Sequence, residues 1–351
     1  MLPYYSGPYF PNHFRNLSSL YDISALSYLD GIRLSYGEEK MIASFHDIIQ
    51  RNTEEAINLV NEKNLHFTTI FLLKSDLKDH GLFDKLNTRN KIAIEILNEI
   101  TTVKNNIPTV KCSLCNYIQT VSSVLKWIIE TGFIDDGLND EFDEILDKAA
   151  ILLIRVYRDN SILPVIVKLA FKRHNKGTCK HDLLWAFFEA REPNSLILIA
   201  NHLLSPHANE VALSRNLLKF VPGIDMNTHT NPHKQYVDFL NWIKENSLFL
   251  YYTGEGFQQT FDPIPYVVVF EAKYLCKGVS VSTGKILEVL TDKEYAQLNM
   301  FNRLDHDKKK LLANFSYYLH QKDINFWNSW ILYPISEQIR TAEPWRGYYH
   351  D

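Results

Sequence analysis

The stretch HDLLWAFFEAREPNSLILIANHLLSPH, residues 181–207, reads as two apolar helices joined by a short break. On each side of the break the apolar residues recur every three to four positions, which is the period of a helix with one buried face. Residues 147–171 show the same arrangement about 34 positions earlier, a spacing typical of helical repeats. The shared pattern predicts a helical hairpin that is repeated in the middle of the chain.

The two segments match without a gap, both at their apolar positions and at the break. Asn160 and Asn194 fall at the break, where an asparagine side chain can cap the second helix of each pair. Pro206 is then expected to end the second helix, because proline cannot donate a backbone hydrogen bond. The matched apolar residues are Ala149, Ala150, Leu153 and Ile154 with Leu183, Leu184, Phe187 and Phe188, and Ile162, Val165, Ile166, Leu169 and Ala170 with Leu196, Ile199, Ala200, Leu203 and Leu204.

A third, looser copy follows, with predicted helices over residues 211–221 and 236–243 and a long loop, 222–233, between them. Taken together, residues 140–245 resemble HEAT-like repeats, the helix-hairpin units of α-solenoids. The resemblance implies a stacked, curved array in which each hairpin buries its apolar face against its neighbours. The alternative is an unrelated helical domain whose hairpins happen to match in phase.

Helical periodicity continues on both sides of these repeats, and alternating strand patterns are scarce. A helix that begins at residue 118 is expected to stop at Gly132, since glycine tolerates the left-handed conformation of a helix end. Residues 266–276 favour a buried helix over a strand, because YVVVF continues into EAKYLC without a break.

These patterns predict an all-α fold, a HEAT-like helical-hairpin solenoid flanked by additional helices. Four parts are expected along the chain. They are a Pro/aromatic tail at 1–17, an N-terminal helical region at 18–135, the repeat array at 136–246, and a C-terminal helical region with an aromatic tail at 247–351.

Composition and charge narrow the functional classes. Of the 351 residues, 46% are hydrophobic and 22% are charged, and the net charge is −4. Affinity for a nucleic-acid backbone needs a clustered excess of Lys and Arg, so nucleic-acid binding is not expected. The sequence starts without the basic segment and apolar run of a secretory signal, and no run of about 18 uncharged apolar residues could cross a membrane. A cytoplasmic protein without membrane insertion is predicted.

Four cysteines are too few for a disulfide framework in a chain of this length. Cys112 and Cys115 form a CxxC pair, whose two-residue gap lets both thiolates reach one zinc ion. A structural zinc site needs two more ligands, and the nearest later candidates are Cys179 and His181. Their spacing does not force them toward the pair. Buried structural thiols without a cofactor are therefore the favoured interpretation, with a zinc site as the alternative.

The acidic run at residues 135–144 could be read as a calcium loop or as paired catalytic carboxylates. It lacks the ligand spacing that ends in a bidentate Glu in calcium loops. Carboxylates at the start of a helix are favoured by the helix dipole, so a capped helix start is predicted.

Aromatic residues and prolines gather at both ends of the chain. Proline keeps these tails out of helices, and aromatic side chains bury a large area at low entropic cost. The tails are therefore expected to dock, either on their own domain or on a neighbouring molecule. The candidate interaction residues are Tyr4, Tyr5, Tyr9, Phe10, Trp345, Tyr348 and Tyr349.

A groove between the repeat array and the C-terminal region is the place where an enzyme site would be expected. No Gly-x-Ser-x-Gly motif occurs, and no spacing identifies a catalytic residue. The candidate polar residues for the groove are His181, Asp182, Glu189 and Glu271.

The expected function is that of a non-catalytic scaffold, because α-solenoids offer extended surfaces to protein partners. One alternative is a coat-type protein that self-associates through its aromatic tails. The Asn and Ile usage and the Pro/Tyr-rich start resemble uncharacterised proteins of spore-forming bacteria, which would place the protein at the spore coat. The other alternative is an enzyme or zinc-binding protein with its site in the groove.

Overall fold

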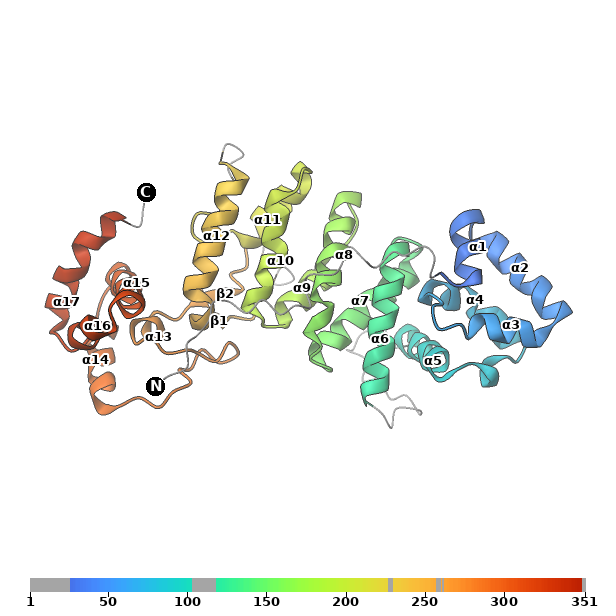
Figure 1. Ribbon diagram of the computed structural model, residues 1–351, viewed down its shortest axis with the longest axis horizontal. Helices are drawn as coiled ribbons and strands as arrows, with labels where there is room; N and C mark the ends of the chain where they lie inside the picture. The colour runs from blue at the N-terminus through green and yellow to red at the C-terminus, as the bar shows by residue number, and fades with distance from the viewer. Residues whose placement is uncertain (1–25, 103–117, 227–229, 257–259, 261, 349–351) are drawn as a thin grey trace. The chain divides into compact units, whose positions relative to one another are not determined.

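The computed structural model describes residues 26–102, 118–226, 230–256, 260 and 262–348. Within them the protein is all-α, with seventeen α-helices and one two-stranded sheet (Figure 1), which confirms the predicted fold class. No helix in these ranges is long and apolar enough to cross a membrane. The chain divides into two compact units, Met1–Ala190 and Arg191–Asp351, with the boundary inside the segment predicted as the array. A single stacked array therefore stays a prediction.

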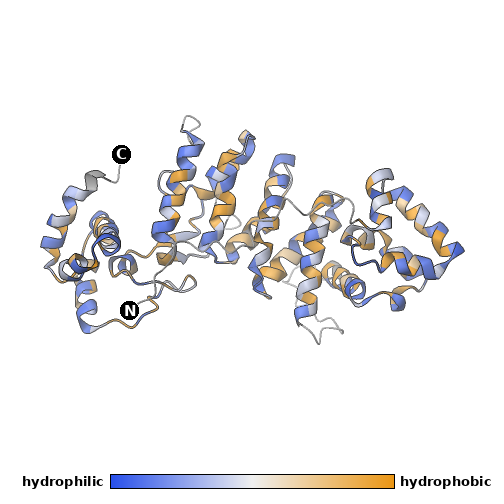
Figure 2. Cartoon of the chain, in the orientation of Figure 1, coloured by the Kyte–Doolittle hydropathy of each residue, from blue (hydrophilic) through white to orange (hydrophobic). Residues whose placement is uncertain are grey.

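Unit 1 contains nine of these helices, and their apolar faces form its core (Figure 2). Within the hairpin segment, α9 packs against both α7 and α8. The helices are α1 (Tyr28–Tyr36), α2 (Glu38–Arg51), α3 (Thr53–Val60), α4 (Phe67–Asp79), α5 (Thr88–Thr102), α6 (Ile118–Gly132), α7 (Asp140–Arg155), α8 (Leu163–Lys176) and α9 (His181–Glu189).

Both segments aligned by the sequence pattern are helical. The first comprises most of α7, the 3₁₀ turn Asn160–Ile162 and the start of α8. The second comprises α9, the 3₁₀ turn Pro193–Ser195 and α10 (Leu196–Ala200), which is in unit 2. All the matched apolar positions are buried except Leu204, which is 47% exposed. The periodicity therefore identified the buried faces of these helices.

The predicted helix caps were wrong. Asn160 and Asn194 both lie inside 3₁₀ turns that precede α8 and α10. Asp159 caps the first of these turns, since its Oδ1 accepts a hydrogen bond from the backbone N–H of Ser161 at 3.0 Å. The apolar pattern locates each helix to within a turn, but it does not show that a tighter turn comes first.

The acidic run begins α7 as predicted. The Asn139 side chain accepts a hydrogen bond from the backbone N–H of Phe142 at 2.9 Å, and Asp140, Glu141 and Asp143 lie in the first turn. The sequence pattern did not indicate what Asp135 and Asp136 do just before this helix.

Two buried arginines hold the turn that follows α6. Asp135 and Asp136 are consecutive, yet each pairs with a different arginine. Arg33 of α1 forms ion pairs with Asp135 at 2.8 Å and with Asp30 at 3.3 Å. Arg173 of α8 donates through Nε to Asp136 at 2.7 Å. The turn therefore ties two helices that are far apart in the sequence to the end of α6.

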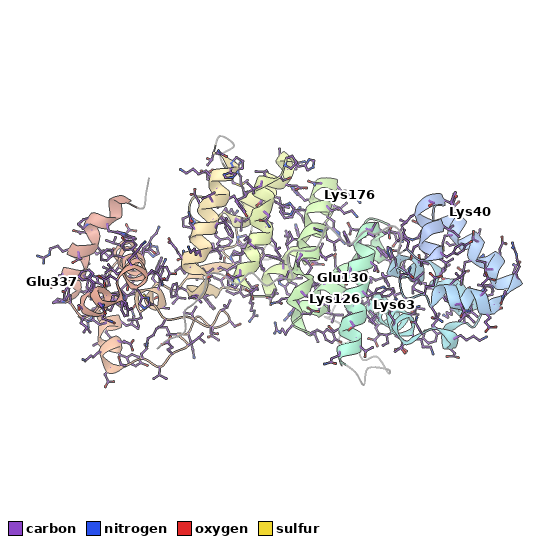
Figure 3. All side chains as sticks on the ribbon, viewed as in Figure 1. Lys40, Lys63, Lys126, Glu130, Lys176 and Glu337 are labelled. Atoms are coloured by element: carbon purple, nitrogen blue, oxygen red, sulfur yellow. The ribbon has the colours of Figure 1, made fainter. Side chains whose placement is uncertain are left out.

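Arg173 also joins α8 to α7. Its guanidinium contacts both carboxylate oxygens of Asp147, at 2.8 and 2.9 Å, and donates to the backbone carbonyl of Asp143 at 3.3 Å. Lys176, labelled in Figure 3, donates to the carbonyl of Asp136 at 3.0 Å. Burial raises the pKa of Asp147 to about 7, and the neighbouring Arg173 opposes that rise. Arg173 is thus the main cation of a buried cluster that is rich in carboxylates.

Gly132 ends α6 for a reason that differs from the prediction. Its φ of −81° and ψ of −24° are right-handed, so no left-handed helix stop occurs. A Cβ at this position would lie 2.9 Å from Cδ2 of Leu146 and 3.3 Å from Cζ of Phe142, both on α7. Close packing of α7 against the end of α6 excludes a side chain here.

Replacing Gly132 by alanine is expected to destabilise unit 1 by about 1–3 kcal/mol, because the added methyl group overpacks a filled core. Hydrogen exchange of α6 and α7 amides measures the change in this unit. Gly31→Ala is the matched control, because a Cβ on this α1 glycine meets no atom within 4 Å. Equal protection in the two variants would contradict the packing explanation.

Unit 2 contains eight helices and the sheet within its described residues. Its core surrounds Tyr274 and Trp330, and the hydroxyl of Tyr274 donates to Oε1 of Gln338 at 2.8 Å. The elements are α10, α11 (Ala208–Leu218), α12 (Pro232–Asn246), β1 (Leu250–Tyr252), β2 (Tyr266–Val268), α13 (Phe270–Tyr274), α14 (Asp292–Asn302), α15 (His306–Lys322), α16 (Ile324–Trp330) and α17 (Ile335–Ala342).

The single buried helix predicted over residues 266–276 was wrong. Its first part is β2, which pairs antiparallel with β1 so that Tyr252 lies opposite Tyr266 and Leu250 opposite Val268. Only Phe270–Tyr274 is helical. The strand depends on a partner some 16 residues earlier, and local periodicity cannot show such a partner.

Candidate ligand pocket

A cavity of about 540 Å³ lies inside unit 2, where α12, α13 and α15 meet. Residue 246, where the array was predicted to end, is the last residue of α12, whereas α13 and α15 belong to the predicted C-terminal region. The volume falls in the range of small-molecule binding sites. Its aromatic residues are Trp242, Phe270 and Trp345, and its charged residues are Lys234, Asp238, Glu245, Lys273, Asp307 and Lys310.

Helical spacing brings these residues to the cavity. On α12 each lining residue has another three or four positions away, which places them on one face of the helix. The helix starts sharply, because the Asn231 side chain accepts from the N–H of His233 and Pro232 occupies the first helical position. His233 is therefore helical and exposed, although the sequence favoured a loop. On α15, Asp307, Lys310 and Asn314 share the facing side.

Lys273 is the buried cation of the pocket, with 1% of its surface exposed. Its Nζ donates to Oδ1 of Asn246 at 2.7 Å and lies 5.4 Å from the centre of the Tyr317 ring. No carboxylate of the described residues lies at ion-pairing distance from this nitrogen. Burial lowers the pKa of Lys273 to about 8, and the negative charge of Glu245 opposes that decrease. The amine is therefore a cation whose immediate hydrogen-bond partner is neutral.

Asn246 is held in place to face Lys273. It is buried at the end of α12, and its Nδ2 donates to the backbone carbonyl of Trp242 at 2.8 Å. This hydrogen bond leaves the amide oxygen for the lysine. The nearby thiol of Cys276 is not a nucleophile at neutral pH, because burial raises the pKa of Cys276 to about 12.

The candidate zinc ligands are only partly described. Cys112 and Cys115 lie outside the described residues, while Cys179 and His181 are exposed at the start of α9. Within the described ranges, no group of three or more metal-ligating side chains is present. The zinc site stays a prediction.

The candidate tail residues are also mostly undescribed. Tyr4, Tyr5, Tyr9, Phe10 and Tyr349 lie outside the described residues, and only the backbone of Tyr348 is placed, in the turn Glu343–Tyr348. The Trp345 ring lies 5.5 Å from the rings of both Phe315 and Tyr318 within unit 2. For this residue, the structure shows contact with its own unit.

The predicted groove residues do not line the pocket. Asp182 is exposed in the first turn of α9 and Glu189 ends the same helix, both in unit 1. Glu271 lies in the first turn of α13, where its carboxylate is 3.7 Å from Nζ of Lys309. Sequence reasoning missed Lys273, two positions further on. The signal that could have indicated it is a lysine inside the run YVVVFEAKYLC, in which Glu271 is the only other charged residue.

Comparison with protein-family models, with curated proteins and with solved structures gave no significant match. The resemblance to HEAT-like repeats therefore stays a prediction from the sequence pattern.

Proposed function

We propose that this chain is a non-catalytic binding protein that engages a protein partner through the pocket between α12 and α15. The observation that carries the proposal is the composition of the pocket, in which Trp242, Phe270 and Trp345 are surrounded by charges of both signs. Aromatic side chains in a cavity with a polar rim are typical of the residues that dominate protein interfaces. The helical hairpins of both units serve as the frame, as in other helical scaffolds.

Replacing Trp242 by alanine tests the proposal. Partners are first identified by crosslinking and mass spectrometry, and each is then purified and titrated against the full chain. Loss of an interface tryptophan is expected to cost about 2 kcal/mol, or roughly a thirtyfold weaker Kd. Trp185→Ala is the matched control, since Trp185 is a half-buried helical tryptophan in unit 1 and outside the pocket.

Trp242 also touches the rings of Phe220 and Phe239, so its replacement can weaken the fold. Lys234→Glu avoids this difficulty, because Lys234 is exposed at the pocket rim. Lys244→Glu, on the same helix and also exposed but outside the pocket, is its control. A partner that binds all four variants as tightly as the unchanged chain would refute the proposal.

Amine catalysis is the second candidate, and Lys273 is the specific observation in its favour. A lysine whose pKa is lowered in a cavity is typical of catalytic lysines. Such an amine condenses with an aldehyde to an imine and water, and borohydride then traps the product. Faster trapping at Lys273 than at the exposed Lys310 would favour this candidate over non-catalytic binding. Self-association through the aromatic tails stays a prediction.

A further inference from the structure

We infer that the pocket of unit 2 accepts a carboxylate of its partner, which forms an ion pair with Nζ of Lys273. The inference rests on the proposed function, since it names the group of the partner that the pocket recognises. It is carried by the surroundings of Nζ, which lines a cavity and has a neutral amide as its immediate hydrogen-bond partner.

The ammonium group of Lys273 has fewer hydrogen-bond acceptors around it than it has donors. An ammonium group has three donors, and the described residues accept from one of them, through Oδ1 of Asn246. The Tyr317 ring covers another side of the group without accepting a hydrogen bond in the ordinary sense. A buried charge is stabilised when it is both paired and hydrogen-bonded, so an anion in the cavity would complete this environment.

The charges around the pocket favour a carboxylate on a larger apolar group over a free polyanion. The lining holds three lysines and three carboxylates, so it offers little net positive potential to a highly charged ligand. A single carboxylate at Lys273 leaves the rest of the ligand against Trp242, Phe270 and Trp345. An acidic side chain of a protein partner has this combination of one charge and an apolar stem.

Binding should depend on pH in a defined direction. The groups that act on Lys273 are Glu245 of α12, Cys276, which follows α13, and Lys310 of α15, and Tyr317 of α15 faces the same amine. A bound carboxylate favours the ammonium form, so it raises the pKa of Lys273. Affinity is therefore expected to be full below about pH 8 and to fall above it, where the amine loses its proton.

The probe is 3-phenylpropanoate, with 3-phenylpropanamide as its uncharged analogue, titrated into the full chain carrying ¹³C-labelled lysine. The acid is expected to bind about tenfold more tightly than the amide or better, because a charged hydrogen bond is lost in the amide. The Lys273 Cε resonance should report an upward shift of its pKa with the acid alone. Lys273→Met should abolish the preference for the acid, while Lys310→Met should reduce it by less than about threefold.

Asn246→Asp is a second variant that leaves the lysine in place. It supplies a carboxylate 2.7 Å from Nζ of Lys273, in the position of the present amide oxygen. This carboxylate should form an ion pair with Lys273 within the protein and so remove the preference for the acid over the amide. Equal binding of acid and amide by the unchanged chain, or a preference that survives in Lys273→Met and in Asn246→Asp, would overturn the inference.

The two proposals fail in different ways. If acid and amide bind equally while Trp242→Ala still weakens a purified partner, the carboxylate inference is wrong and protein binding stands. If the acid is preferred but no partner depends on Trp242 or Lys234, the protein-binding function is wrong, and the pocket is a site for small free carboxylates.

Discussion

Replacing Arg173 by methionine is expected to destabilise unit 1 by about 3–5 kcal/mol, the usual cost of removing one partner of a buried ion pair. Arg173 is 3% exposed and contacts the carboxylates of Asp136 and Asp147. Methionine fills much of the same volume, so the loss comes chiefly from the unpaired carboxylates and not from a cavity. The variant also frees the carbonyl of Asp143, which accepts from the guanidinium.

The size of this loss should depend on pH. Because burial already raises the pKa of Asp147 to about 7, removal of the arginine should raise it further and leave the carboxyl neutral at lower pH. A neutral carboxyl is cheaper to bury than a carboxylate, so the destabilisation should shrink between pH 8 and pH 5.

Hydrogen exchange of α7 and α8 amides separates this effect from the stability of unit 2. Lys168→Met is the control, because Lys168 is exposed on the same helix and its replacement should change stability by less than about 0.5 kcal/mol. A loss for Arg173→Met no larger than that of the control would show that the buried ion pairs do not stabilise the unit.

The sequence allowed the helices to be predicted because their signal is local. The apolar residues of α7 and α9 recur at helical spacing and lie in the core, as expected. The end of α6 shows the limit of such reasoning. A glycine after a helix favours a left-handed stop, yet Gly132 is required by Leu146 on another helix. The sequence does not show contacts between helices, so Gly132 was correctly predicted to end α6, but for the wrong physical reason.

The residues that line the pocket were not predicted from the sequence. The predicted groove between the array and the C-terminal region stays a prediction, and Lys273, which lines the observed pocket, was not among its predicted residues. Acidic residues and histidines in amphipathic helices are selected as candidate site residues because of their chemistry. A lysine between apolar residues is usually expected to extend its charged end to solvent. Lys273 is instead buried and lines the pocket, with its Nζ directed to Asn246 of α12 and to the ring of Tyr317 of α15. Val268 of β2 also lines the pocket, and the pairing of β2 with β1 was not predicted from the sequence.

Replacing Lys273 by methionine is expected to stabilise unit 2 by about 2 kcal/mol at pH 7. A pKa lowered from 10.5 to about 8 corresponds to about 3 kcal/mol of unfavourable burial of the charge. The change also leaves Oδ1 of Asn246 without its donor, which reduces the expected gain in stability by about 1 kcal/mol. The apolar stem of the lysine is conserved by methionine, so packing beside Tyr317 should change little.

The sign of the pH dependence identifies the cause. The unfolded lysine holds its proton up to about pH 10.5, whereas the folded one releases it near pH 8, so the stability of the unchanged chain should rise with pH between these values. The methionine variant lacks this rise. Its advantage should therefore be largest below pH 8, should disappear between pH 8 and pH 10.5, and should become a disadvantage of about 1 kcal/mol near pH 10.5, when only the lost hydrogen bond to Asn246 remains. Amide exchange of α13 and α15 in the two proteins measures this change. Lys310→Met should show neither effect, since Lys310 is exposed.

A Lys273→Met variant that is less stable than the unchanged chain at pH 7 would mean that the buried amine is already well paired. It would remove the physical reason for expecting a carboxylate in the pocket. A gain in stability would instead show that the charge of Lys273 destabilises the folded unit. Binding groups commonly lower the stability of the fold that contains them.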